Sequence, residues 1–180
     1  MSVTVEALDV RRFHYFRELS DDEAAEAAAG LEAVQVGPGD QLFRQGTGGD
    51  SAYLLVRGRV EIKVAVSQTQ DRVLATLLPG AIFGEVSLLS DEPRTAAAVA
   101  RAESELWVVT RPAFSQAIER RETWAIRLLE AMAEVLCRRL SSVDQELAAL
   151  IGRNGTAASP TDRQRFADLQ SLHQHLFAAG

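Results

Sequence analysis

The sequence predicts an α+β fold, in which an antiparallel β-sandwich or jelly roll is flanked by N-terminal helices and a long C-terminal helix. Apolar residues recur at helical spacing within the first thirty residues. Short β-branched runs separated by turn signals then fill residues 34–110, and residues 122–151 contain neither glycine nor proline. A chain of 180 residues with 47% hydrophobic content is long enough to bury such a core.

The N-terminal part predicts two helices. Four apolar residues at helical spacings predict the first helix over residues 6–19: Leu8, Phe13, Phe16 and Leu19. Ser20 then supplies an N-cap before three acidic residues of a first helical turn. This second helix is rich in alanine and ends near Gly30.

The central region predicts an antiparallel β unit. Turn signals rich in glycine separate short apolar and β-branched runs at residues 37–40, 46–50, 58 and 79–80. Their spacing suits a sandwich or jelly roll better than a βαβ fold. The candidate strands are Gln41–Gln45, Ala52–Val56, Arg59–Val66, Arg72–Leu78, Thr95–Ala100 and Glu105–Val109.

Helix returns after the last candidate strand. Thr110 precedes Pro112, a pattern typical of a helix N-cap with proline near the first helical position. The uninterrupted residues 122–151 then predict one long helix.

The end of the chain predicts a separate tail. Residues 152–159 predict a flexible link, and Pro160 begins a last amphipathic helix. We therefore expect a domain over residues 1–151, which includes the N-terminal helices and the long helix, and a linker with a helical tail over residues 152–180.

The long helix carries an apolar heptad seam. Its residues alternate steps of four and three, as in a coiled coil: Leu129, Ala133, Leu136, Leu140, Val143, Leu147 and Leu150. In a parallel pair, Arg139 faces Asp144 of the partner helix with opposite charge. The seam predicts a homodimer through Leu129–Leu150, and the alternative is that the seam packs on its own sandwich.

A second stripe lies about 100° round the same helix. It consists of Leu128, Met132, Val135, Arg139 and Ser142, so it becomes polar toward its C-terminal end. We expect its apolar part to pack on the sandwich. Its polar part either covers a polar ligand or is a solvated flank.

Charge and composition exclude several function classes. The 19 basic and 25 acidic residues give a net charge of -6, so direct DNA binding is not expected. One cysteine, Cys137, and three histidines near the chain ends disfavour a disulfide framework or a metal centre. The sequence shows neither a signal peptide nor a membrane span, and we expect a reduced, soluble, cytoplasmic compartment.

Residues 83–96 carry the chemistry. Gly84 permits close approach of the backbone, and the short helical turn after it directs unpaired amide N–H groups toward the loop. Such an N-terminus attracts an anion. Arg94 can return to the same place and contact phosphate oxygens, and Glu85 can accept hydrogen bonds from a ribose hydroxyl. The segment therefore predicts one site for a phosphate and a sugar.

This segment resembles the phosphate-binding cassette of cyclic nucleotide-binding domains. The match consists of Gly-Glu-Val-Ser-Leu at residues 84–88, a short loop, and Pro-Arg-Thr-Ala at residues 93–96. Residues 39–46, 49–55 and 58–60 also match, in the order of the family. The resemblance covers about residues 8–150. It implies a cyclic nucleotide ligand, cAMP or cGMP, and no metal.

The resemblance implies a role for each cassette residue. Glu85 binds the ribose 2′-hydroxyl, and Arg94 neutralises the cyclic phosphate. Amides around Gly84, Val86 and Ser87 approach the sugar and the phosphate.

Further residues complete the implied site. Asp50 orients the phosphate-binding arginine, and Thr95 lies near the phosphate or the base. Val73 and Leu74 form an apolar wall against the base, and Arg139 of the long helix meets the purine. The candidate ligand-binding residues are thus Phe83, Gly84, Glu85, Val86, Ser87, Arg94, Thr95, Ala96, Val73, Leu74 and Arg139, with Asp50 behind them.

Two functions of different classes fit these observations. The first is a soluble sensor, not an enzyme, that binds cAMP or cGMP and signals to an unidentified effector protein through movement of the long helix. We favour cAMP, and cGMP is the competitor. The family's transcription factors append a winged helix-turn-helix, for which the residues after Ile151 are too few. The alternative is a degenerate cyclic nucleotide-binding fold that acts as a ligand-independent dimeric scaffold.

Overall fold

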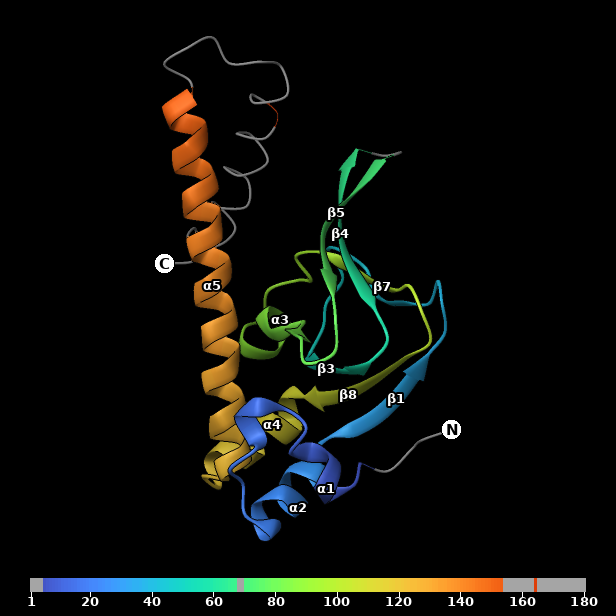
Figure 1. The fold of residues 1–180 in the computed structure, drawn as a ribbon, viewed down its shortest axis with the longest axis vertical. Coiled ribbons are helices and arrows are strands. Elements are labelled where there is room, and N and C mark those ends of the chain that lie inside the picture. Colours follow the sequence, from blue (N-terminus) through green and yellow to red (C-terminus); the bar gives the residue numbers. More distant parts are fainter. Residues whose placement is uncertain (1–4, 68–69, 154–163, 165–180) are drawn as a thin grey trace. The chain divides into compact units, whose positions relative to one another are not determined.

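The structure confirms the predicted fold class. The computed structural model describes residues 5–67, 70–153 and 164. Within them, two antiparallel four-stranded sheets with strand orders β1-β8-β3-β6 and β2-β7-β4-β5 face each other as a sandwich (Figure 1). The first sheet consists of β1 (Glu32–Val36), β8 (Ser104–Thr110), β3 (Ser51–Arg57) and β6 (Ile82–Phe83), and the second of β2 (Gln41–Phe43), β7 (Ala97–Ala100), β4 (Val60–Ser67) and β5 (Gln70–Leu77).

The helices lie before, within and after the sandwich. They are α1 (Ala7–Val10), a 3-10 helix (His14–Phe16), α2 (Asp21–Gly30), α3 (Glu85–Leu89), α4 (Arg111–Glu119) and α5 (Thr123–Arg153). Both predicted N-caps are confirmed. Ser20 Oγ accepts from Glu23 N in a capping box, and Thr110 Oγ1 accepts from Ala113 N.

The first predicted helix, over residues 6–19, is wrong as a continuous element. α1 has four residues, and Phe13 then adopts an extended backbone with φ -80° and ψ 130°. The break lets Phe13, Phe16 and Leu19 all enter the core. The Phe13 ring lies 5.3 Å from that of Trp107 on β8. Tertiary packing outweighs the weak preference of a short helix, which is marginal in isolation.

The strand predictions are confirmed for six strands, with shifted ends. β2 ends at Phe43 instead of Gln45, and β7 begins at Ala97 instead of Thr95. β1 and β6 were not among the candidate strands. β1 pairs with β8, and the two residues of β6 pair with Tyr53 and Leu54 of β3. A strand of two residues is too short to show a period.

The first sheet is buried on both faces. Leu54 belongs to the apolar cluster between this sheet and the helices, and Leu55 belongs to the cluster between the two sheets. Both side chains are fully buried. Because successive strand residues point to opposite faces, a strand in this position needs apolar residues throughout, which explains the continuous run in β3.

The long helix is confirmed as α5. The chain forms two compact units, residues 1–132 and 133–180, whose border lies inside this helix. In the first unit, Leu128 and Met132 of the second stripe are fully buried, whereas Leu129 of the heptad seam is 38% exposed. The start of the second stripe therefore packs on the domain, as expected, and the start of the seam does not.

The end of α5 corrects one boundary. Gly152, predicted as the first residue of the link, is still helical, and α5 ends at Arg153. The rest of the link and the tail helix predicted from Pro160 lie outside the described residues, apart from Gln164. The domain division at residues 151 and 152 stays a prediction. Among the described helices, none combines the length and the apolar character that crossing a membrane requires.

Candidate functional site

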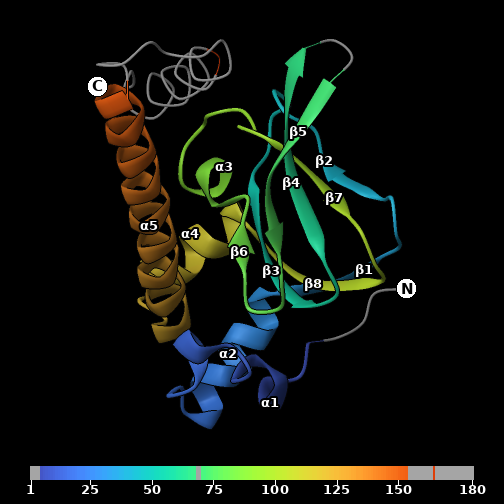
Figure 2. The same ribbon diagram turned by 45° about the horizontal axis from the view of Figure 1, so that its top comes forward.

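Three chain segments form the predicted cassette. β6 leads through Gly84 into α3, the loop after α3 returns to Arg94, and the start of β3 lies beside α3 (Figure 2). Gly84 has φ +77°, a left-handed conformation that glycine adopts without strain. A Cβ atom at this position would lie 2.7 Å from Arg94 Nη1 and 3.2 Å from Ser51 O. Glycine is therefore needed both for the turn and for the arginine beside it.

Arg94 is at the centre of the site and is only 4% exposed. Its Nη1 donates to Ser51 O at 2.8 Å and to Gly84 O at 2.9 Å, and its Nη2 donates to Ser51 Oγ at 3.0 Å. Its Nε is buried and has no hydrogen-bond partner among the described residues. Uncharged oxygens thus hold the guanidinium in place.

The loop before β3 fixes the main chain of Arg94. Arg94 N donates to Thr47 O, and Gly46 N donates to Arg94 O, both at 2.8 Å. A Cβ atom at Gly49 would lie 2.6 Å from Arg94 Cζ. The side chain of Arg94 therefore fits only because two glycines, Gly49 and Gly84, leave space beside it.

Aromatic rings line the other side of this guanidinium. Arg94 Cζ lies 4.3 Å from the ring centroid of Phe43 and 5.7 Å from that of Tyr53. The Tyr53 ring stacks on Phe83, with centroids 5.2 Å apart and an interplanar angle of 16°. The faces of these rings attract the cation, but they carry no net charge that would neutralise it.

The charge of Arg94 is therefore compensated only in part within the described residues. Burial lowers the pKa of Arg94, and the neighbouring Tyr53, Asp50 and Glu85 act in the opposite direction. None of the described carboxylates forms an ion pair with the guanidinium. Because a buried charge without a paired opposite charge is costly, this position favours an anionic ligand.

The remaining cassette residues differ in their exposure. Phe83, Glu85 and Ser87 are each 1% exposed, and Ala96 is 8% exposed. Val86 is half-buried and Thr95 is exposed. The structure thus brings the buried Glu85 carboxyl group into the electrostatic neighbourhood of Arg94. The part that each residue plays toward a ligand stays a prediction.

Ser51, which the sequence did not single out, accepts hydrogen bonds from Arg94, and the orienting role of Asp50 stays a prediction. Asp50 is exposed, and its charge raises the pKa of Arg94 without a hydrogen bond to it. Ser51 supplies two of the three oxygens that accept from the guanidinium. Ser51 directly follows Asp50 and is 8% exposed. The sequence signal that could have indicated Ser51 is a small polar residue at the start of an apolar strand.

The predicted apolar wall lies at an irregular point of β5. Val73 pairs with Lys63, and Ala75 pairs with Ile62, so Leu74 is the additional residue of a β-bulge. The bulge interrupts the alternation of side chains. Val73 is 46% exposed and Leu74 is 51% exposed, which leaves both apolar side chains available for contact.

Arg139 belongs to the second unit of the chain, in α5. The contact predicted between its side chain and a purine base stays a prediction. In the same unit, Arg138 and Glu134 form an ion pair one helical turn apart, at 3.2 Å.

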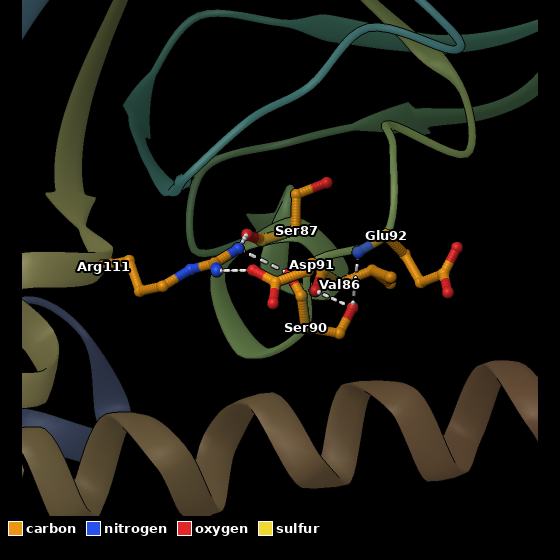
Figure 3. A network of polar contacts seen from close by, with 6 residues as sticks. All are labelled: Val86, Ser87, Ser90, Asp91, Glu92 and Arg111. Atoms are coloured by element: carbon orange, nitrogen blue, oxygen red, sulfur yellow. Dashed lines mark hydrogen bonds and ion pairs between the residues drawn. The ribbon is translucent and has the colours of Figure 1, made fainter. Parts of the chain in front are cut away.

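Arg111, the first residue of α4, makes a polar network that sequence reasoning missed (Figure 3). Its Nη2 donates to Ser87 O at 2.7 Å and to Ser90 O at 2.5 Å, and its Nη1 pairs with the Asp91 carboxylate. The backbone N of Arg111 donates to Asp50 O at 2.6 Å. No local pattern in the sequence connects residues separated by 20 or more positions.

This site can hold an anion beside the buried Glu85 carboxyl group, which can accept hydrogen bonds from a hydroxyl. Where the structure describes the chain, it contains no group of three His, Cys, Asp or Glu side chains placed to hold a metal ion. The contacts of Arg94 offer one kind of chemistry, the binding of an anion by a buried guanidinium.

Comparison with known proteins agrees with this geometry. The profile of the cyclic nucleotide-binding domain matches residues 33–121. The chain is 33% identical over 169 residues to the cyclic AMP receptor protein of Thermus thermophilus. This alignment covers 91% of this chain and 76% of the relative. The chain is also 30% identical over 119 residues to a cAMP-dependent protein kinase regulatory subunit of Blastocladiella emersonii. This second alignment covers 66% of this chain and 30% of the relative.

The fold is also similar to that of a solved structure. The crystal structure of the Thermus thermophilus catabolite activator protein superposes with a TM-score of 0.66 at 33% identity, over 76% of this chain and 62% of that chain. The chain thus spans three quarters of the length of the receptor protein and less than two thirds of this solved chain. It spans under a third of the kinase subunit.

Replacing Ser51 with alanine should lower the free energy of unfolding by about 1–3 kcal/mol, because a buried charged N–H then loses its acceptor. The matched control is Ser115→Ala on the exposed face of α4, which should change stability by less than about 0.5 kcal/mol. Urea denaturation of the full chain measures both. Equal losses in the two variants would show that Ser51 does not hold the guanidinium.

Proposed function

Because the chain belongs to the cyclic nucleotide-binding domain family, we propose that it is a regulatory sensor that binds a cyclic nucleotide, cAMP in the first instance, at Arg94 and Glu85. The observation that carries the proposal is the burial of Arg94 among uncharged oxygens and aromatic rings. A cyclic phosphate carries one negative charge and has two oxygens outside its ring. It supplies both the counter-charge and the acceptors that a guanidinium fork binds well.

The rest of the ligand fits the surroundings of Arg94. Arg94 donates to Gly84 O, and Glu85 is the next residue, so we expect one nucleotide to reach both Arg94 and Glu85 with its phosphate and its ribose hydroxyl. The exposed Val73 and Leu74 offer apolar surface to a base, and the exposed Thr95 offers a hydroxyl. These residues support a ligand that combines an anion, a sugar and a planar ring.

The choice of cAMP before cGMP follows the relatives. The two relatives compared above are named for cAMP, and their similarity covers 91% and 66% of this chain. Thr95 can donate to or accept from either base, so its hydroxyl does not decide between them. A titration with both nucleotides separates the two possibilities.

We further propose that the nucleotide signal leaves through α5 to a partner protein. A ligand can shift the helix only if it binds one helix arrangement more tightly than another. The seam of α5 supports a second role for this helix, because Leu129 is exposed while its neighbour Leu128 is fully buried. In this proposal two copies of the chain associate through the seam.

Isothermal titration of the folded full chain with cAMP and with cGMP tests the nucleotide site. We expect binding of cAMP, and Arg94→Met should weaken that binding by about 2–5 kcal/mol, since a buried charge pair loses one member. Arg57→Met is the matched control, because Arg57 is an exposed arginine that pairs with Glu105 on the surface. Its effect should stay within about 0.5 kcal/mol. Absence of heat with both nucleotides would favour the degenerate scaffold.

The seam is tested by light scattering at micromolar concentration. We expect a homodimer for the wild type and a monomer for Leu140→Glu, because a charge at an a position of a heptad is incompatible with a dry interface. Ser141→Glu, one position away and off the seam, should leave the dimer intact. A monomeric wild type would exclude the seam as a dimer contact.

A further inference from the structure

α3 is held at its two ends by two different arginines. The helix has five residues, so its axis is about 7.5 Å long. At its N-terminal end, Arg94 Nη1 donates to Gly84 O, the carbonyl of the N-cap residue. At its C-terminal end, the side chain of Arg111 reaches the last carbonyl groups (Figure 3). One short helix therefore links the two arginines.

The C-terminal contacts of α3 are complete only with Arg111. Ser90 satisfies Val86 O through both its backbone N and its Oγ, at 2.9 and 2.8 Å. Ser87 O and Ser90 O accept from Nη2 of Arg111. The last carbonyls of a helix carry partial negative charge, which a cationic donor stabilises. Arg111 thus replaces the local cap that a longer helix would have.

Arg111 also belongs to the frame around Arg94. Its backbone N donates to Asp50 O at 2.6 Å, and the next residue, Ser51, accepts two hydrogen bonds from Arg94. One residue therefore contacts α3 through its side chain and the start of β3 through its main chain. These are the two segments that enclose the Arg94 guanidinium.

On its other side, Arg111 begins the helix that leads to α5. Thr110 caps α4, and the turn after α4 has Arg121 in the left-handed conformation at φ +58°. Glu122 N donates to Ala117 O, and Arg121 N donates to Ile118 O. These two bonds form a Schellman motif, and only three residues separate α4 from α5. A shift of the first turn of α4 therefore reaches the start of α5 through one short, hydrogen-bonded turn.

We propose that Arg111 is the positioning residue that couples occupancy of the cassette to the position of α4. The coupling rests on the proposed nucleotide function. An anion can bind the donors that the described contacts leave over, Nε–H and one N–H of Nη2, and a shift of the guanidinium toward the anion changes how the N-terminal end of α3 is held. Because α3 has only five residues between its two arginine contacts, its C-terminal carbonyls then change their position relative to Arg111, and α4 follows.

The carbonyl contacts of Arg111, and not its ion pair, carry this coupling. The Asp91 side chain is 95% exposed, and exposed ion pairs contribute little. The Arg111 side chain is 31% exposed and its Nε is buried. A guanidinium fork reaches two carbonyls and a carboxylate at once, whereas a lysine offers one nitrogen. Asp91→Asn is therefore a matched control that removes only the ion pair.

Hydrogen–deuterium exchange of the full chain, with and without saturating cAMP, tests the proposal. In the wild type, cAMP should change protection in α3 and also in residues 111–124. In Arg111→Met, saturated according to its own affinity, the change in α3 should remain and the change in residues 111–124 should disappear. Its cAMP affinity should fall about tenfold, which is within the usual range for coupled sites. Asp91→Asn should behave as the wild type.

Arg111→Lys keeps the experiment decisive if the methionine variant does not fold. It should restore part of the change in residues 111–124, because one carbonyl contact can be remade. A full response in Arg111→Met or in Arg111→Lys would overturn the coupling role, as would a wild type that binds cAMP without any change in residues 111–124. A wild type that does not bind cAMP would overturn the proposed function itself.

Discussion

The site is organised around one constraint, the burial of the Arg94 guanidinium where no described carboxylate pairs with it. Gly49 and Gly84 leave the space that the side chain occupies, and Ser51 supplies two of its acceptors. The ring of Phe43 lies over the cation. Each contact lowers the cost of burying the charge, but none removes the charge. The fold therefore keeps a cation inside that an anionic ligand can neutralise.

The short helix α3 is held by hydrogen bonds from two arginines. Arg94 holds its first carbonyl and Arg111 holds its last ones, and the main chains of both arginines are anchored to the loop that leads into β3. The chain belongs to the cyclic nucleotide-binding domain family. The contacts of its two arginines connect the cassette to the rest of the domain. The sandwich supports this arrangement, because β3 contacts α3 and pairs with β6, the strand that leads into α3.

The sequence predicted the elements whose signals are local. The N-caps at Ser20 and Thr110, the long helix, six strands and the cassette with Glu85 and Arg94 all depend on patterns within a few residues. The failures have a different origin. The helix over residues 6–19 broke because Phe13 packs against Trp107, far away in the sequence. Ser51 and Arg111 gain their roles from contacts across 20 to 43 positions, which no period or cap records.

Thermal unfolding of the wild type and of Arg94→Met, each with and without cAMP, tests the central claim that Arg94 is a buried charge kept for a ligand. At a cAMP concentration 100 times the Kd of the wild type, we expect the wild type to be stabilised by about 2.7 kcal/mol and the variant by less than about 1 kcal/mol, because the variant binds cAMP more weakly. Without ligand, the variant should lose no more than about 1–3 kcal/mol, because removal of a buried charge offsets most of the cost of the three acceptors left without their donor. A variant that loses several kcal/mol of stability without ligand, beside a wild type that does not respond to cAMP, would contradict the account and make Arg94 a structural residue.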